Sequence, residues 1–393
     1  MHTAVRPSSS HSKVSVILLL LSMVLLGVFP LDILLPSFPA LSAHFNTSSA
    51  NIALSISIFA IGFSISQFFL GPLSDRLGRK RLLIIGMLVS IAGAGGCLGS
   101  TQFSTFILFR SIQAIGCGCF VLSNALVQDI FSNDERERVR ILMTSASGVF
   151  ISTAPLLGTL MQNLFGWTGS FYLFVVIAGL VLVHARWALP AAIIAPSNSG
   201  FWRCCVRIVS NRRFMGFSLL AAIAFTCHFA FIAISPVIFL ENMGLTQLEF
   251  SFVLLIYGAA YVAGGIVASR LQKLVSHQQQ LRTGLALIAL AGLVLTGLHL
   301  VTDPGLLTVL LPMMICTLGT SIVRPVAASR AMDVLPDNAG AAASMLNTTV
   351  FVTGGVMSAV ASMTVGHFET VLGGAFLVLS ATGWVLVRQL YRS

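Results

Sequence analysis

The sequence predicts an all-α membrane protein with twelve transmembrane helices arranged in two halves of six. The 393-residue chain is 56% hydrophobic and only 9% charged, and its mean hydropathy of +0.95 excludes an ordinary soluble protein. Apolar runs of roughly 18 to 25 residues recur throughout, and each is long enough to cross the hydrocarbon core of a bilayer as a helix. Nearly all of the positive charge lies between those runs or at their ends.

The apolar runs also define the expected domains. A polar tail, 1–13, precedes an N-terminal half of six helices at 14–186. The longest interruption, 187–213, contains prolines and serines and is expected to be a linker before the C-terminal half at 214–393. The twelve expected helices are 14–34, 49–72, 82–100, 103–127, 139–162, 167–186, 214–239, 248–269, 281–302, 305–331, 340–364 and 369–388.

The distribution of Lys and Arg predicts the orientation of the chain. With the tail, the linker and the C-terminus in the cytoplasm, all but two of the 22 Lys and Arg residues fall in cytoplasmic segments. The net charge of +10 therefore follows the membrane topology and does not predict nucleic-acid binding. The two exceptions, Arg110 and Arg324, lie inside expected helices.

No cofactor, metal or enzymatic site is expected. The seven cysteines follow neither a metal-ligand spacing nor a disulfide framework, so they are expected to be packing residues. The sequence contains neither a paired His/Glu set nor a Ser/His arrangement of the kind that would indicate an enzyme. Because no Gly-rich ATP-binding loop is present, an ion gradient is the expected source of energy.

The most strongly charged stretch is GPLSDRLGRKR, at Gly71–Arg81. It contains one acid and four cations between two apolar runs, and its two glycines permit a sharp turn. We expect it to connect the second and third helices and to act as a gating loop. The residues of this expected loop are Gly71, Asp75, Arg76, Gly78, Arg79 and Lys80.

The Gly71–Arg81 segment resembles the loop signature of the major facilitator superfamily. Other motifs extend this resemblance over nearly the whole chain. Leu108-Phe-Arg110-Ser-Ile-Gln113-Ala-Ile-Gly116 is similar to the fourth-helix motif, and Ala154-Pro155-Leu-Leu-Gly158 to the core of the fifth-helix antiporter motif. The first and seventh helices resemble the Bcr/CflA drug-resistance branch, at Pro30-Leu-Asp32-Ile-Leu-Leu-Pro36-Ser-Phe-Pro39 and Ser235-Pro236-Val-Ile-Phe-Leu-Glu241.

The chain departs from these patterns at a few positions. Ala154 stands where the antiporter motif has glycine, and Asn124 and Gln128 stand where branch members carry arginines late in the fourth helix. Arg324 is not part of the branch pattern.

The resemblance implies a fold, a location and a mechanism. The fold is two six-helix pseudo-repeats with a central site, in a multi-pass protein of the bacterial inner membrane. Asp75 is expected to cap the N-terminus of the eleventh helix near 338–340, and Arg79 to pair with Asp129. These two contacts would latch the outward-facing state.

Two groups inside the helices could bind protons, and a third could modulate one of them. A carboxylate such as Asp32 in an apolar helix is costly unless it is paired, solvated or protonated, so we expect it to be the coupling acid, with Arg110 modulating it. A static pair, or an acid in the outer vestibule, is the alternative. His228 is expected either to be a second proton site or to make one structural hydrogen bond.

Other buried groups could bind a substrate. The guanidinium group of Arg324 must face either a partner or an aqueous cavity, so it is either an anion site or half of a structural salt bridge. The expected substrate-binding residues are Asp32, Arg324, Asn124, Tyr257 and Tyr261.

The leading interpretation is a proton-coupled exporter of small amphiphilic molecules, either drug-like compounds or an endogenous metabolite such as a carboxylate siderophore. A proton symporter that imports a metabolite or metal chelate, and a membrane scaffold, remain open. The expected partners are the substrate, protons and the lipid bilayer. The oligomeric state is open, with a monomer as the working expectation.

Overall fold

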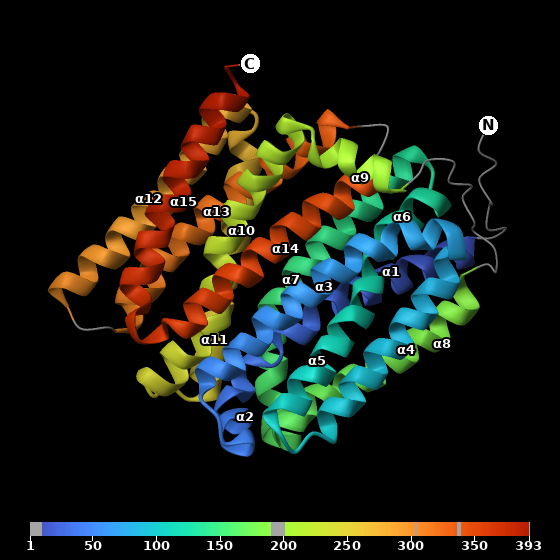
Figure 1. Cartoon of the computed structure of the whole chain (residues 1–393), viewed down its shortest axis with the longest axis horizontal. Helices are drawn as coiled ribbons and strands as arrows, with labels where there is room; N and C mark the ends of the chain where they lie inside the picture. The colour runs from blue at the N-terminus through green and yellow to red at the C-terminus, as the bar shows by residue number, and fades with distance from the viewer. Residues whose placement is uncertain (1–9, 190–200, 303–304, 336–338, 393) are drawn as a thin grey trace. The chain divides into compact units, whose positions relative to one another are not determined.

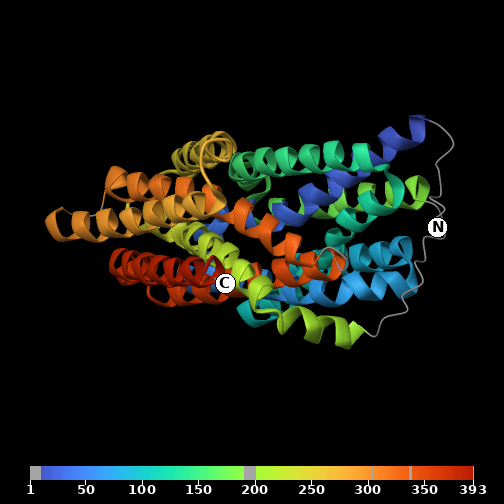
Figure 2. The same ribbon diagram turned by 90° about the horizontal axis from the view of Figure 1, so that it is seen from above.

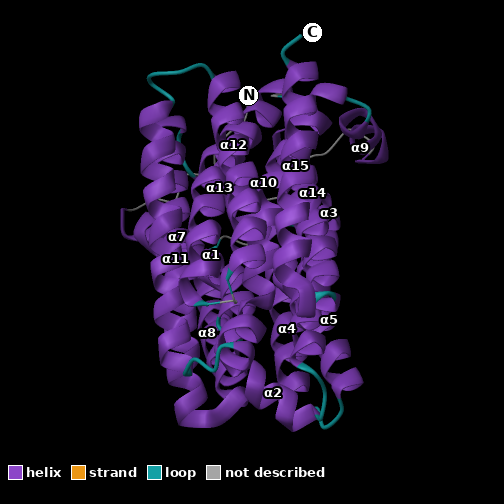
Figure 3. Cartoon of the chain, turned by 90° about the vertical axis from the view of Figure 1, so that its left-hand side faces the viewer, coloured by secondary structure: helices purple, strands orange, loops and turns teal. Residues whose placement is uncertain are grey.

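The computed structural model describes residues 10–189, 201–302, 305–335 and 339–392, and within them it contains helices and no strand (Figure 3). The long helices are α1 (Ser10–Asp32), α3 (Ser49–Leu77), α4 (Arg79–Leu98), α5 (Phe103–Cys117), α7 (Asn133–Phe165), α8 (Gly169–Ala188), α10 (Arg212–Pro236), α11 (Gln247–Leu271), α12 (His277–Val301), α13 (Leu306–Val334), α14 (Ala339–Met363) and α15 (Phe368–Leu390). The short elements are η1 (Leu35–Ser37), α2 (Phe38–Phe45), η2 (Gly118–Val121), α6 (Leu122–Ile130), η3 (Gly166–Thr168), α9 (Phe201–Val209), the π-helix η4 (Val237–Asn242) and η6 (Val365–His367).

Eleven stretches of the described chain, against twelve expected, are long and apolar enough to cross a membrane. One of them, Ala146–Ala188, is 43 residues long. It contains most of α7, the η3 turn and all of α8. The turn begins at Gly166, whose φ of 66° is readily adopted only by glycine.

The chain divides into two compact units. Unit 1 consists of Met1–Ser37 and Gly62–Phe201, and unit 2 of Phe38–Ile61 and Trp202–Ser393. The division near residue 201 falls inside the expected linker. The segment Phe38–Ile61, which we expected in the N-terminal half, instead groups with unit 2.

Contacts to α14 explain the grouping of Phe38–Ile61. The hydroxyl groups of Ser57 and Ser358 lie 2.8 Å apart, and the absence of a side chain at Gly355 leaves space that Ile61 fills. Ser49 also donates a hydrogen bond to the carboxylate of Glu241 in η4. A sequence-based division at the longest polar interruption has no access to these contacts between distant residues.

Small residues allow the helices of unit 1 to pack closely. Helix α4 packs on α5 and α8, and α1 packs on α7 and α8. A side chain at Gly93 would lie 2.6 Å from the Cα atom of Gln113, and one at Gly116 would lie 2.6 Å from the Cα atom of Ser90. At these positions the backbones of α4 and α5 contact each other directly, with no side chains between them.

Unit 2 follows the same principle. Helix α12 lies beside α13 and α15, and α10 packs on α13 and α14 (Figures 1 and 2). A side chain at Gly292 would lie 2.7 Å from the carbonyl oxygen of Gly373, and one at Gly319 would lie 2.6 Å from that of Gly284. Outward-facing apolar residues such as Leu293, which is 59% exposed, suit a lipid environment.

Candidate functional site

Among the side chains of unit 1 that the structure describes, Arg110 is the most deeply buried charged group, with a relative exposure of 1%. Its Nη1 donates to the Oε1 of Gln113 over 2.8 Å, and its Nη2 donates to the carbonyl oxygen of Pro30 over 3.0 Å. The guanidinium carbon also lies 5.7 Å from the ring centre of Phe171 in α8. Pro30 belongs to the last turn of α1, where carbonyl groups lack an intrahelical donor and a cation is favourable. Arg110 therefore joins α5 to the end of α1.

Asp32, the last residue of α1, is half-buried. Within the described residues its carboxylate makes neither a hydrogen bond nor an ion pair. The contact that we considered between Arg110 and Asp32 is therefore not direct. Arg110 holds the main chain two residues earlier, which positions the helix end that carries the acid.

The antiporter-like residues of α7 pack against the same helix end. A side chain at Gly158 would clash with the carbonyl group of Ile33, whose oxygen also accepts a hydrogen bond of 3.4 Å from Ser170. Ala154 and Pro155 lie buried one turn earlier. Glycine at 158 thus lets α7 approach the main chain next to Asp32.

The predicted loop forms the junction between α3 and α4. Gly78, with φ of 88°, makes the turn, and the hydroxyl group of Ser74 donates to the carbonyl oxygen of Gly71 over 2.5 Å. Arg79 donates through Nε to the Oδ2 of Asp129 over 3.0 Å, and it also donates to Ser74. The predicted pairing of Arg79 with Asp129 is therefore present, and it ties the loop to the end of α6.

Lys80 ties the same loop to α8. Its Nζ donates to the carbonyl oxygens of Arg186 and Leu189, over 2.7 and 2.6 Å. These carbonyls belong to the C-terminal end of α8, where a cation neutralises the helix dipole. The side chains of Asp75 and Arg76, and the expected contact of Asp75 near 338–340, lie outside the described part of the structure.

Unit 2 contains a cluster of aromatic and basic side chains from three helices. The Nδ1 of His228 in α10 lies 2.6 Å from the hydroxyl group of Tyr257 in α11. The two rings stack with centres 5.3 Å apart and an interplanar angle of 10°. Tyr261, one helical turn further along α11, lies 5.6 Å from the His228 ring. The structure therefore contains the structural hydrogen bond that was one of our two expectations for this histidine.

Arg324 in α13 completes this cluster. Its Nη1 lies 3.5 Å from the hydroxyl group of Tyr261, and its guanidinium carbon lies 4.8 Å over the ring of Phe225. Among the described residues no carboxylate pairs with it, so the structural salt bridge that we considered is not observed. A half-buried cation held by rings retains donors for a ligand.

The two aromatic partners of the buried arginines were not among the sequence-predicted site residues. Phe171 and Phe225, the ring neighbours of the two arginines, belong to a chain with 28 phenylalanines and carry no distinguishing pattern. Phe225 does lie three residues before His228, which places both on one face of α10. The predicted Asn124 is exposed on α6 and belongs to unit 1, whereas the cluster belongs to unit 2.

Comparisons with known proteins agree with this architecture. The family model described as Major Facilitator Superfamily matches residues 18–359. The crystal structure of a D-xylose-proton symporter has the same fold, with a TM-score of 0.75 at 16% sequence identity over 95% of this chain and 97% of that chain.

Similar sequences include named bacterial resistance proteins. The chain is 25% identical to the bicyclomycin resistance protein homolog of Haemophilus influenzae, over 92% of each chain. It is 27% identical to the multidrug resistance protein MdtL of Salmonella paratyphi A, over 84% of this chain and 83% of that protein. It is also 24% identical to the MFS-type transporter YdgK of Bacillus subtilis, over 89% of each chain. The chain therefore belongs to the Major Facilitator Superfamily of membrane transporters, and it resembles the drug-resistance branch of that family.

Proposed function

We propose that this transporter is a proton-coupled antiporter that exports small amphiphilic molecules by alternating access, as a monomer. The observation that carries the proposal is the carboxyl group of Asp32. It ends an apolar helix and has no hydrogen-bond or ion-pair partner in the described residues. A carboxyl group in that position can exchange a proton without breaking a structural contact. The names of the resistance proteins support export.

We assign substrate contact to the cluster of His228, Tyr257, Tyr261 and Arg324, with Asp32 and Asn124 contributing from unit 1. Aromatic faces bind flat apolar groups, and the remaining donors of Arg324 bind an anion. An endogenous carboxylate such as a siderophore fits the basic group, whereas drug-like compounds fit the relatives' names. His228 is a second proton site in this scheme.

We further propose twelve transmembrane helices with both termini in the cytoplasm of a bacterial inner membrane. The 43-residue apolar stretch contains two helices, α7 and α8, which supports counting it twice. The distribution of Lys and Arg supports the orientation. The two six-helix halves, 14–186 and 214–393, would rock about a central site, with the Gly71–Arg81 loop as inner latch.

Proton flux in proteoliposomes tests the coupling. An imposed pH gradient should drive substrate movement, and substrate should release protons that a trapped pH-sensitive dye detects. Asp32→Asn should abolish both signals while leaving substrate binding measurable. The matched control is Asp333→Asn, an exposed carboxylate at the end of α13 that should have no effect. Full-rate coupled exchange by Asp32→Asn would reject the role of Asp32.

Three ligands that differ in charge test the substrate assignment. The binding of bicyclomycin, of a lipophilic cation and of an amphiphilic carboxylate should each be measured in competition assays, both with the wild type and with Arg324→Gln. Loss of carboxylate binding alone would support the anion site, and equal losses for all ligands would remove it. Transport measured in vesicles of known orientation decides whether the substrate is exported or imported. Import with protons would establish the symporter, and no movement of any ligand would favour the scaffold.

A further inference from the structure

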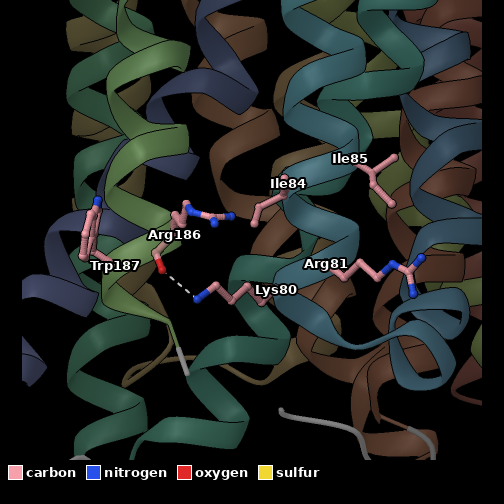
Figure 4. A pocket seen from close by; sticks show the side chains of 6 residues that line it. All are labelled: Lys80, Arg81, Ile84, Ile85, Arg186 and Trp187. Carbon is pink, nitrogen blue, oxygen red and sulfur yellow. Dashed lines mark hydrogen bonds between the residues drawn. The ribbon is translucent and has the colours of Figure 1, made fainter. Parts of the chain in front are cut away.

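A basic pocket lies at the junction of α4 and α8 in unit 1. It is a shallow, open pocket with a volume of about 750 Å³. Its lining residues are Lys80, Arg81, Ile84, Ile85, Arg186 and Trp187, with no acidic residue among them (Figure 4).

The cations of this pocket differ in whether their hydrogen-bond donors already have partners. Lys80 already donates to two carbonyl oxygens at the end of α8, so its main role is structural (Figure 4). The exposed guanidinium groups of Arg81 and Arg186 have no hydrogen-bond or ion-pair partner in the described residues. By contrast, the neighbouring Arg79 is occupied by Asp129. The guanidinium group of Arg186 points toward Ile84, whereas that of Arg81 points away from Arg186, so one phosphate can contact Arg186 while Arg81 adds positive charge at the rim (Figure 4).

The faces that continue from the pocket are apolar and exposed. On α4, Arg81 is followed by Ile85 and Leu88, 43% and 51% exposed, at the spacing of one helical face. On α8, Trp187 is preceded at helical spacing by Val183, Leu180 and Val176, which are 58%, 67% and 58% exposed. A soluble anion would gain nothing from these surfaces, whereas acyl chains would cover them.

We propose that this pocket binds the phosphodiester headgroup of an anionic phospholipid, whose acyl chains lie along the exposed faces of α4 and α8. Arg186 contacts the phosphate, Arg81 attracts the headgroup through its charge at the rim of the pocket, and Trp187 packs at the level of the glycerol backbone, where indole rings are favoured. Basic pockets between transmembrane helices recognise anionic headgroups in this way. Because Lys80 belongs to the Gly71–Arg81 loop, a bound lipid would also stabilise the junction of that loop with α8.

Native mass spectrometry of the purified full chain tests this site. The probes are phosphatidylglycerol and phosphatidylcholine with identical acyl chains. The wild type should retain phosphatidylglycerol in preference to phosphatidylcholine. The double variant Arg81→Gln/Arg186→Gln should bind phosphatidylglycerol roughly 30-fold more weakly, because each cation near the membrane contributes about a factor of five. Arg81→Lys/Arg186→Lys should retain most of the binding.

The matched control is Arg270→Gln/Arg282→Gln, which removes two exposed cations near the α11–α12 connection of unit 2 and no pocket residue. It should bind phosphatidylglycerol like the wild type. Equal binding by the pocket variant and the wild type, or an equal loss in the control, would overturn the proposal. Competition by millimolar inorganic phosphate would assign the pocket to a soluble anion and would also overturn it.

Discussion

Arg110 in α5 donates a hydrogen bond of 3.0 Å to the carbonyl oxygen of Pro30 in α1, two residues before Asp32. The same side chain donates to Gln113 one turn along its own helix. Arg110 thus fixes the end of the helix that carries the candidate coupling acid. Its effect on Asp32 acts through the position of the main chain.

Replacing Arg110 should therefore destabilise unit 1 as well as alter coupling. Arg110→Leu would leave a buried amide and a helix-end carbonyl without donors, at a cost of about 2 kcal/mol or more. We expect a clear drop in the unfolding temperature in detergent. Ser111→Ala, which removes a hydroxyl group bonded only within α5, is the control and should be nearly neutral. If Arg110→Leu unfolds at the same temperature as the wild type, the hydrogen bond to Pro30 does not contribute to stability.

The ion pair between Arg79 and Asp129 should contribute measurable coupling energy. The two side chains are only 12% and 21% exposed, so solvent screens the pair incompletely. In a double-mutant cycle with Arg79→Gln and Asp129→Asn, we expect a coupling of about 1 kcal/mol in thermal unfolding. Lys13 and Glu135, 40% and 38% exposed, form the comparison pair and should couple more weakly. Equal coupling of both pairs would contradict this ranking.

Backbone contact between α4 and α5 should make Gly93 intolerant of a side chain. In Gly93→Ala the new methyl group would lie 2.6 Å from the Cα atom of Gln113, and the neighbouring backbone cannot rotate away. Overpacking of this kind costs about 1–3 kcal/mol. The control is Gly95→Ala, two residues along the same helix, where no atom outside that helix lies within 4 Å of the added methyl group. It should leave the unfolding temperature unchanged or raised, since alanine favours helix.

Glu135 predicts a pH dependence outside the membrane-spanning segments. The ammonium group of Lys13, 2.7 Å away, and hydrogen bonds from Ser132 lower the pKa of Glu135 from 4.5 to about 2. Since the pKa is depressed in the folded state, the contribution to stability is present above pH 4.5 and is lost as the pH falls toward 2. Exposure to solvent keeps the contribution small.

Thermal unfolding of Glu135→Gln and the wild type checks this dependence. The variant should be the less stable protein at pH 7, and the difference should shrink between pH 4.5 and 3. In a Lys13→Met background, Glu135→Gln should change the thermal stability less at every pH. A difference that grows on acidification would have the wrong sign and would reject the interpretation.

Charge and hydropathy by themselves determined the class of the protein, and the resemblance of its motifs to a known family indicated the family and one tertiary contact. In a chain with only 9% charged residues, each acid and cation stands out, and the apolar runs have the length of a membrane helix. The pairing of Arg79 with Asp129 followed from the resemblance to the family motif. The residues of the Gly71–Arg81 loop were predictable for the same reason.

Only the tertiary structure decided which groups the buried cations contact. Arg110 binds a main-chain carbonyl, which every residue possesses and which leaves no mark in the sequence. Arg324 lies against Phe225 and Tyr261 because α10, α11 and α13 place them together, and this depends on helix rotation. The grouping of Phe38–Ile61 with unit 2 likewise rests on contacts with α14. Hydrophobic periodicity specifies that a helix forms, whereas packing between helices specifies which of its faces meets which neighbour.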